Sequence, residues 1–272
     1  MVFVPATEIV DDVERMQRVA REVHFSEVAF LVPDGPDVAY RARFFTPERE
    51  LAYAGHPTLG SAVVWAHETA PMAERLHLTQ ATQGARAQVV VERRSGTTVA
   101  EVAAPRPTWG ATSEARGAAR ALGLTEAART GCEAPFVATA PVPQAFVEVP
   151  RALLPTLHPD AAALRRFGEA TGVSLVYAYA LATQPDGGIE ARGFASALGI
   201  GEDPATGSAA GTLGYALAAQ GRLSEGTRCT IGQGEAVGRP SAIVLRYAEG
   251  TVYVGGRVRF VGSGRLMSEF LA

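Results

Sequence analysis

Residues 201–214 read GEDPATGSAAGTLG, and this stretch carries the most specific structural information in the chain. Two acids precede a proline, and small residues then lead directly into an apolar segment. A P-loop would need a lysine before its serine, a dinucleotide fingerprint a third glycine, and a nucleophile elbow the sequence GxSxG, and all three are missing here. What remains is a helix start, with Pro204 leading into the first turn and Thr206 in the capping position.

Such a helix start is suited to holding an anion. The N–H groups of Gly207, Ser208 and Ala209 would point out of the helix end, which carries roughly +0.5 charge. Residues 55–57 (Gly-His-Pro) open a second helix in the same way. If the two ends face each other, they form a cleft for a small carboxylate and for the enolate-like charge that develops when a C–H proton is removed.

The chain repeats this arrangement once. Residues 44–66 (FFTPERELAYAGHPTLGSAVVWA) and residues 193–218 (GFASALGIGEDPATGSAAGTLGYALA) share an aromatic strand end, an acidic loop and a Gly-Ser-Ala-rich helix. The triplets that begin at Gly60 and Gly207 set the register of this comparison. Helices of this composition are slim on all sides, which predicts two similar lobes, each with one helix buried among strands. Chance similarity between two alanine-rich helices is the alternative.

Hydrophobic periodicity predicts alternating helices and strands along the chain. A short apolar strand is expected at Met1–Val4, and the first helix would be capped by Asp11 or Asp12. The expected helices cover about residues 11–23, 58–67, 113–122, 160–171 and 207–220. After the last helix we expect strands at residues 228–233, 241–247, 251–254 and 257–261.

Composition excludes several classes of function. The net charge is −3 over 272 residues and no basic stripe is present, so nucleic acid is not an expected partner. No window reaches the ~18 apolar residues that a membrane span needs, and a cytoplasmic location is expected. The two cysteines, Cys132 and Cys229, lie far apart and outside any CxxC pattern, so they are interpreted as free thiols and no metal site is expected.

Proton transfer on a bound carboxylate needs an acid/base group near the helix ends. The candidates are Glu27, His56, Glu202 and Asp203. Each also has a plain structural interpretation: His56 as a polar helix-end residue, Asp203 as a turn cap, and Glu27 as a charge at a strand edge. If Glu27 is partly buried in its strand, its pKa would be raised, which would let it both take and give a proton near neutral pH.

Four motifs together resemble one known family. They are FSEVAF, RFFTPERELAYAGHPTLGSA, GEDPATGSAAGTLGYAL and GQGEAVGRPS, and they extend in order from near residue 13 to near residue 265. The ordered set resembles the phenazine-biosynthesis PhzF-like family, which belongs to the diaminopimelate-epimerase-like fold.

The resemblance implies an α+β fold with two pseudo-symmetric lobes, each a curled, mostly antiparallel sheet around a central helix. The proline-containing segment from Ala104 to Trp109 is the expected boundary. We therefore expect an N-terminal lobe of residues 1–105, completed by about residues 255–272, and a C-terminal lobe of residues 106–254. The resemblance also implies an isomerase without cofactor or metal, with its active site between the lobes, that acts on a small carboxylate-bearing substrate and is usually a homodimer.

In the N-terminal lobe the resemblance assigns the proton shuttle to Glu27, with Ser26 beside it. Gly55 and His56 would line the site. Family members usually begin with a further strand and a turn ending in GNP, which this sequence lacks, so we expect either a late start or a missing first strand.

In the C-terminal lobe the resemblance assigns substrate contacts to Asp203, Gly207 and Ser208. The best-known members isomerise trans-2,3-dihydro-3-hydroxyanthranilate by moving a proton within the ring system. Related racemases use a cysteine pair, and a two-thiol mechanism is not expected here because neither cysteine lies in a motif. A catalytically silent binding protein of the same fold is the main alternative, and a hydrolase that uses Ser208 is a weaker one.

Overall fold

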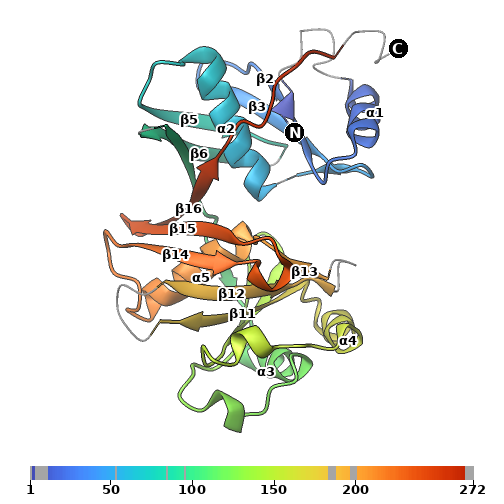
Figure 1. The fold of residues 1–272 in the computed structure, drawn as a ribbon, viewed down its shortest axis with the longest axis vertical. Helices are drawn as coiled ribbons and strands as arrows, with labels where there is room; N and C mark the ends of the chain where they lie inside the picture. The colour runs from blue at the N-terminus through green and yellow to red at the C-terminus, as the bar shows by residue number, and fades with distance from the viewer. Residues whose placement is uncertain are drawn as a thin grey trace. The chain divides into compact units, whose positions relative to one another are not determined.

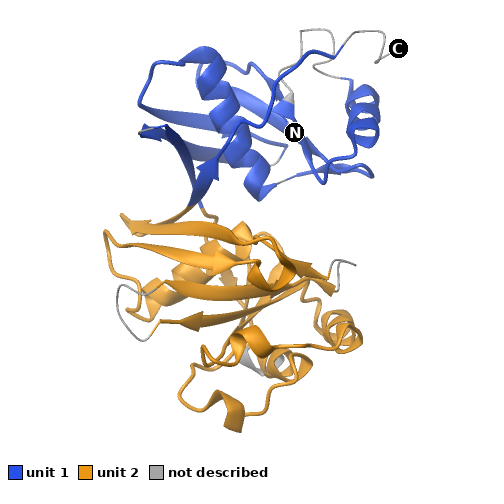
Figure 2. Ribbon diagram, viewed as in Figure 1, with its two compact units in different colours: residues 1–103, 255–272 blue, residues 104–254 orange. Residues whose placement is uncertain are grey.

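Strands covered by helices on both faces form the framework of the fold (Figure 1). The computed structural model describes residues 2–3, 12–52, 54–83, 85–94, 96–182, 188–196 and 201–266. The chain divides into two units: unit 1 contains residues 1–103 and 255–272, and unit 2 contains residues 104–254 (Figure 2). Each unit combines helices with a mostly antiparallel sheet, which confirms the α+β class.

Unit 1 has the strand order β1-β2-β3-β5-β6-β7-β16, with β4 paired to β3. The β1–β2 and β3–β5 pairs are parallel, whereas β2–β3, β5–β6 and β6–β7 are antiparallel. Its elements are β1 (Val2–Phe3), α1 (Val13–Val23), β2 (Val28–Val32), β3 (Tyr40–Phe45), β4 (Glu50–Leu51), α2 (Gly55–Thr69), β5 (Arg75–Ala81), β6 (Arg86–Arg94), β7 (Thr97–Ala103) and the last part of β16 (Thr251–Val258).

Strand β2 shows how unit 1 is layered. Ala29 and Leu31 belong to the buried cluster around α2, whereas Val28 and Phe30 pack with Met16 of α1 on the other face. Successive side chains of a strand point to opposite faces, so a strand between two helices is apolar throughout. This explains the uninterrupted sequence VAFLV in β2.

Unit 2 has the strand order β16-β15-β14-β12-β11-β10-β9-β8, with β13 paired to β12. Its strands are the first part of β16, β8 (Thr108–Trp109), β9 (Phe136–Thr139), β10 (Pro143–Glu148), β11 (Leu175–Leu181), β12 (Ile189–Phe194), β13 (Glu202–Asp203), β14 (Arg228–Gln233) and β15 (Ser241–Ala248). Its helices are α3 (Thr112–Ala121), α4 (Ala161–Thr171) and α5 (Gly207–Ala219), with short 3₁₀ turns η2 (Ala127–Arg129), η3 (Leu154–Thr156) and η5 (Glu235–Val237).

Unit 2 is layered in the same way around α5. On β11, Tyr177 and Tyr179 face the cluster that contains α5, whereas Val176 and Ala178 face α3 and α4. Helix α5 is buried over most of its length, and a Cβ on Gly214 would lie 2.7 Å from a methyl of Val252. Close packing of this kind requires the small residues that the sequence supplies. The expectation of a slim helix buried among strands is therefore confirmed for α5.

Most expected elements are present, with differences at specific residues. The first helix is capped by Asp12, whose Oδ1 accepts from Arg15 N at 3.0 Å; Asp11, Met1 and Val4 lie outside the described residues. The second helix begins at Gly55 rather than at residue 58, because Gly55, His56 and Pro57 form its first turn.

The expectation of two strands, at residues 251–254 and 257–261, is wrong: one strand, β16, runs without a break from Thr251 to Val258, and residues 259–261 lie beyond its end. Glycines occupy positions 255 and 256, between the two expected strands. In the structure, Gly255 is inside the strand because a Cβ there would lie 2.5 Å from the carbonyl oxygen of Ala100. Close backbone approach is the second use of glycine in a strand, besides a turn.

The internal repeat is visible in two matching ion pairs. In unit 1, Arg43 on β3 donates Nε and Nη2 to the carboxylate of Glu50 on β4 at 2.8 and 2.9 Å. In unit 2, Arg192 on β12 donates the same two nitrogens to Glu202 on β13 at 2.9 and 2.7 Å. Each pair fixes a two-residue strand against a longer one. Planar two-point pairing of this kind gives a defined geometry as well as energy.

These ion pairs also set the register of the repeat. Each short strand is followed, at the same spacing, by a glycine that begins the central helix: Gly55 begins α2 and Gly207 begins α5. The register that matched Gly60 with Gly207 is therefore wrong by five residues, because Gly60 lies inside α2. In the corrected register His56 corresponds to Ser208, and each is the second residue of its helix.

Within the described ranges, no helix is long and apolar enough to cross a membrane.

Candidate active site

Glu27 and His56 lie together at the first turn of α2. His56 Nε2 is 3.1 Å from Glu27 Oε2. The Glu27 side chain is 20% exposed, whereas that of His56 is 73% exposed. The carboxylate is therefore mostly withdrawn from water, whereas the imidazole beside it is largely in contact with solvent. A carboxylate and an imidazole in direct contact can exchange a proton, which is a basic requirement of acid/base catalysis.

The local sequence explains why these two residues meet. Glu27 directly precedes β2, which is the strand that packs between α1 and α2. His56 is the second residue of α2, and Thr58 N makes the first backbone bond of that helix to Ala54 O at 3.3 Å. The N–H groups of Gly55 and His56 belong to the first turn of the helix, which is the positive end of the helix dipole. This positive end therefore lies beside Glu27. Ser26 forms an exposed bend beside it.

Asp203 is held at the start of α5 by its own loop. Its Oδ2 accepts from Thr206 Oγ1 at 2.7 Å, and its Oδ1 accepts from Ala205 N at 3.3 Å. Thr206 occupies the N-cap position as expected, but it makes no side-chain capping bond, because its hydroxyl proton goes to Asp203. The turn-cap interpretation of Asp203 therefore describes its local bonds correctly, and it does not exclude a second role for the same carboxylate.

The N-terminus of α5 presents several hydrogen-bond donors. Among the described residues, no backbone acceptor is present for the N–H groups of Gly207, Ser208 and Ala209, and the first backbone bond of the helix runs from Ala210 N to Thr206 O at 3.0 Å. Such an end favours an anionic group.

Ser208 is hydrogen-bonded to an amide and not to a base. Gln144 on β10 donates Nε2 to Ser208 Oγ at 2.9 Å, so the hydroxyl proton of Ser208 is available for a ligand. A serine nucleophile needs a partner that removes its proton, and a glutamine amide cannot do this. The arrangement supports a binding role for Ser208 and argues against the hydrolase alternative.

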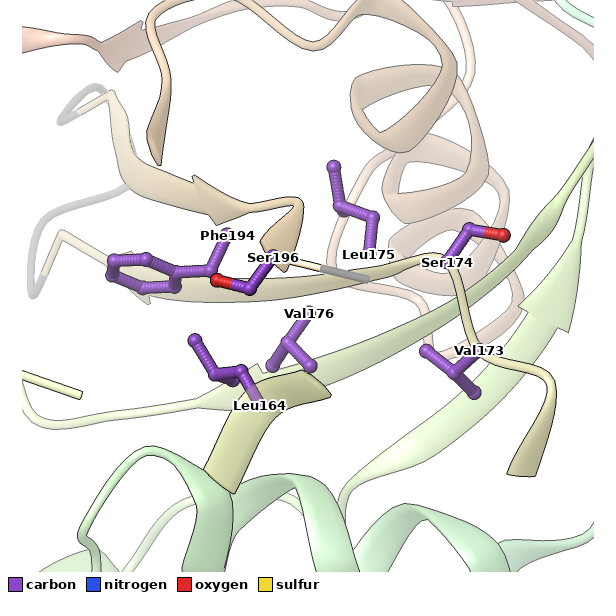
Figure 3. Close-up of a pocket in the computed structure, with 7 residues that line it drawn as sticks. All are labelled: Leu164, Val173, Ser174, Leu175, Val176, Phe194 and Ser196. Atoms are coloured by element: carbon purple, nitrogen blue, oxygen red, sulfur yellow. The ribbon is translucent and has the colours of Figure 1, made fainter. Parts of the chain in front are cut away.

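A shallow hollow elsewhere in unit 2 does not match this chemistry. It lies between α4 and the strands β11 and β12 (Figure 3), and it leaves essentially no volume that a water molecule could occupy. Ligand pockets usually have roughly 300–1,000 Å³. Five of the seven labelled side chains are apolar, and the two polar ones are serines. We therefore assign no ligand to it. Within the described ranges, no group of three or more potential ligand residues that could hold a metal ion is found.

The expected site residues form two groups, one in each unit. Unit 1 brings together Ser26, Glu27, Gly55 and His56, and unit 2 brings together Asp203, Gly207 and Ser208. Glu202, also considered as an acid/base group, is occupied by its ion pair with Arg192.

Sequence reasoning assigned no function to Gln144 or Gln233. Gln144 is isolated in an apolar strand, and no sequence pattern identified it. Gln233 lies in the GQGEAVGRPS motif, but its partners are far away in the sequence.

Comparison with known proteins places the chain in a family. The family model described as "Phenazine biosynthesis-like protein" (PhzC-PhzF) matches residues 2–265. A trans-2,3-dihydro-3-hydroxyanthranilate isomerase from Pseudomonas aeruginosa is 36% identical over 263 residues, covering 94% of this chain and 87% of the relative. An isomerase from Deinococcus radiodurans, described as uncharacterized, is 34% identical over 85% of this chain and 76% of the relative.

Solved structures agree with this match. A structure described as a "Predicted Epimerase" from Pseudomonas aeruginosa has a TM-score of 0.74 and 30% identity, covering 96% of this chain and 93% of that one. A PhzF-family protein from Bacillus anthracis has a TM-score of 0.75 at 19% identity, covering 95% and 92%, and shows the shared fold. A probable proline racemase from Agrobacterium radiobacter has the same fold, with a TM-score of 0.61 at 14% identity, covering 97% and 86%. The resemblance inferred from the four motifs is confirmed, and the chain belongs to the phenazine biosynthesis-like (PhzC-PhzF) family.

Proposed function

We propose that this protein is an isomerase that moves a proton between two carbon atoms of a small carboxylate-bearing substrate, with Glu27 as the group that takes and returns it. The Glu27 carboxylate removes a proton from carbon, and the electron pair enters the conjugated system of the substrate. The protonated Glu27 then delivers the proton to a second carbon. The substrate keeps its atoms and electrons, so the step needs no oxidant and no reductant.

The contact between Glu27 and His56 is the observation that carries this proposal. A carboxylate that is largely withdrawn from water is a stronger base toward carbon than a solvated one. His56, 3.1 Å away, can donate a hydrogen bond to the carboxylate or accept its proton between the two steps. The names of the curated relatives, which are isomerases, support the same reaction class.

We propose that Asp203, Gly207 and Ser208 bind substrate, as do Ser26 and Gly55. The donors at the start of α5 suit a carboxylate, and Asp203 suits a donor such as an amino or hydroxyl group. The substrate of the Pseudomonas aeruginosa relative, trans-2,3-dihydro-3-hydroxyanthranilate, carries all of these groups. It is therefore the first substrate to test.

We also propose that the chain forms a homodimer. Light scattering on the protein as it elutes from a size-exclusion column would measure its molar mass in solution.

The test of the reaction is isotope incorporation. The protein is incubated with trans-2,3-dihydro-3-hydroxyanthranilate in deuterated water, and the product is analysed by mass spectrometry and proton NMR. We expect the product to be isomerised and to carry carbon-bound deuterium, because the proton on Glu27 exchanges with solvent between the two steps. Binding of the compound without isomerisation and without deuterium at carbon would instead support the silent binding protein.

The cysteines provide a separate prediction. Burial raises the pKa of the Cys229 thiol, and burial followed by the charge of Glu148 raises that of Cys132. Thiols with raised pKa values hold little thiolate at neutral pH and are poor bases. We expect the double variant C132A/C229A to keep kcat/KM within about threefold of the wild-type value. A much larger loss at an unchanged melting temperature would point to a thiol mechanism.

A further inference from the structure

We propose that Gln233, at the end of β14, is a positioning residue that fixes the Asp203 carboxylate through the hydroxyl group of Thr206. The inference rests on the proposed function for its effect on turnover, because Asp203 is assigned there to substrate binding. Gln233 is 3% exposed. It lies in the GQG sequence of residues 232–234, to which neither the fold nor the proposed reaction has yet given a role.

Two backbone groups fix the orientation of the Gln233 amide. Thr206 N donates to Gln233 Oε1 at 3.2 Å, and Gln233 Nε2 donates to Asp203 O at 2.7 Å. A peptide N–H can only donate and a peptide carbonyl can only accept. The reversed amide would place two donors against each other at Thr206 and two acceptors against each other at Asp203. The oxygen of Gln233 therefore faces Thr206 N, and its NH₂ group faces Asp203 O.

The fixed amide then determines where the Thr206 hydroxyl points. Gln233 Nε2 donates its second hydrogen to Thr206 Oγ1 at 2.9 Å. Because a hydroxyl has only one hydrogen, Thr206 Oγ1 donates that hydrogen to Asp203 Oδ2, at 2.7 Å. The series of donors thus runs in one direction, from Gln233 through Thr206 to the carboxylate.

Tyr177 completes the hydrogen bonding of Gln233. Its hydroxyl donates to Gln233 Oε1 at 2.9 Å. Burial, and to a smaller extent the charge of Asp203, raises the pKa of Tyr177, so this hydroxyl stays protonated and remains a donor. Gln233 thereby uses both hydrogens and both lone-pair positions of its amide. A fully paired buried network of this kind holds its members in one arrangement.

Two glycines leave the space that the network occupies. A Cβ on Gly193 of β12 would lie 2.8 Å from Thr206 Oγ1 and 3.1 Å from Gln233 Nε2. A Cβ on Gly234 would lie 2.7 Å from Pro204 O and would also collide with Arg239 O. Ser241 Oγ donates to Pro204 O at 2.8 Å and so secures the same loop from β15. The backbone around residues 203–206 is therefore shaped to admit Gln233.

The functional consequence concerns the geometry of Asp203. One carboxylate oxygen receives the Thr206 hydroxyl and the other receives Ala205 N, so the carboxylate plane has a defined direction. A displacement of about 1 Å at a substrate-positioning group can cost on the order of 100-fold in rate. Gln233 would thus affect turnover without touching the substrate.

The test compares the variants Gln233→Leu, Thr206→Val and Thr206→Ser. We expect Gln233→Leu and Thr206→Val each to lower kcat/KM for trans-2,3-dihydro-3-hydroxyanthranilate about 10–100-fold. Thr206→Ser keeps the hydroxyl and should stay within about threefold of the wild-type value. The double variant with both Gln233→Leu and Thr206→Val should lose no more kcat/KM than the worse of these two single variants, because both residues act through the same hydroxyl.

Unit 1 contains a matched control. Gln80 is fully buried, accepts from the Tyr40 hydroxyl at 2.8 Å and donates to Thr58 Oγ1 at 3.2 Å. In that Tyr–Gln–Thr set the threonine hydroxyl donates to the carbonyl of Ala54 and not to a carboxylate. Gln80→Leu should therefore lower the melting temperature as Gln233→Leu does, while kcat/KM stays within about threefold. Equal losses of kcat/KM in both leucine variants would show a general effect of lost stability and would overturn the inference.

Amide hydrogen exchange tests the positioning without any turnover. In the wild-type protein we expect slow exchange in residues 201–208, and in Gln233→Leu and Thr206→Val at least about tenfold faster exchange there, with the rest of unit 2 unchanged. Unchanged exchange, or kcat/KM within about threefold for both variants, would overturn the inference. If the wild-type protein turns over no substrate, the proposed function fails, and the exchange result still decides whether Gln233 holds the loop.

Discussion

Substitution of Glu27 by glutamine is expected to lower the isomerisation rate by roughly 10²–10⁴-fold, the usual range for loss of a general acid/base. Glutamine has nearly the shape of glutamate and can still accept a hydrogen bond from His56, but it cannot take a proton from carbon. Carbon-bound deuterium should disappear together with turnover. The measurement is the initial rate in deuterated water, together with the melting temperature, which we expect to change little because glutamine has nearly the same shape and volume as glutamate.

Glu92 on β6 is a suitable control for this substitution. Its side chain is 18% exposed, close to the 20% of Glu27, and it forms ion pairs with Arg75 and Arg94. Glu92→Gln removes the same charge from the same unit, so its isomerisation rate should match that of the wild-type protein. Equal losses in the two variants, or wild-type deuterium incorporation in Glu27→Gln, would remove Glu27 as the proton carrier.

Among the substitutions proposed above and below, Gly234→Ala is expected to cause the largest loss in the free energy of unfolding. Gly234 has φ of +87°, a conformation that costs a residue with a side chain about 1–2 kcal/mol. The added methyl would also press on the carbonyl oxygens of Pro204 and Arg239. Overpacking adds about 1–3 kcal/mol, so we expect a total loss of about 2–5 kcal/mol. In a chain of this size that corresponds to a melting temperature lower by roughly 5–15 °C.

Gly226 separates the two causes of this loss. Its φ is +77°, yet a Cβ there would meet nothing within 4 Å. Gly226→Ala therefore carries only the conformational cost, about 1–2 kcal/mol. If both variants melt at the same temperature, the collision with Pro204 and Arg239 is relieved by a small backbone shift, and Gly234 is required only for its backbone conformation.

The sequence was sufficient for the parts of the site that depend on neighbouring residues. Gly207 begins α5 and Thr206 precedes it because proline, small residues and an N-cap side chain are local signals. Family membership followed from four motifs in order. The pairing of Glu27 with His56 required the fold, since β2 and α2 meet only after unit 1 has assembled.

Contacts between distant segments could not be predicted in detail. Thr206 was expected to cap its helix, but its hydroxyl proton goes to Asp203, because Gln233 approaches from β14 and takes up one side of that hydroxyl. The register of the repeat was wrong because the triplets at Gly60 and Gly207 look alike as sequence. Only the ion pairs of Arg43 and Arg192 identify the equivalent positions.

Strand β16 has a consequence for how the polypeptide folds while it is being synthesised on the ribosome. Unit 2 is built from one continuous segment, residues 104–254, whereas β7 of unit 1 has β16 (Thr251–Val258), which is synthesised after most of unit 2, as its neighbour in the sheet. Until that last strand emerges, the nascent N-terminal unit carries an unpaired β7 edge, which is a template for aggregation. A premature stop near residue 254 would leave that edge permanently open, so such a product should depend on chaperones even though every residue of unit 2 has been translated.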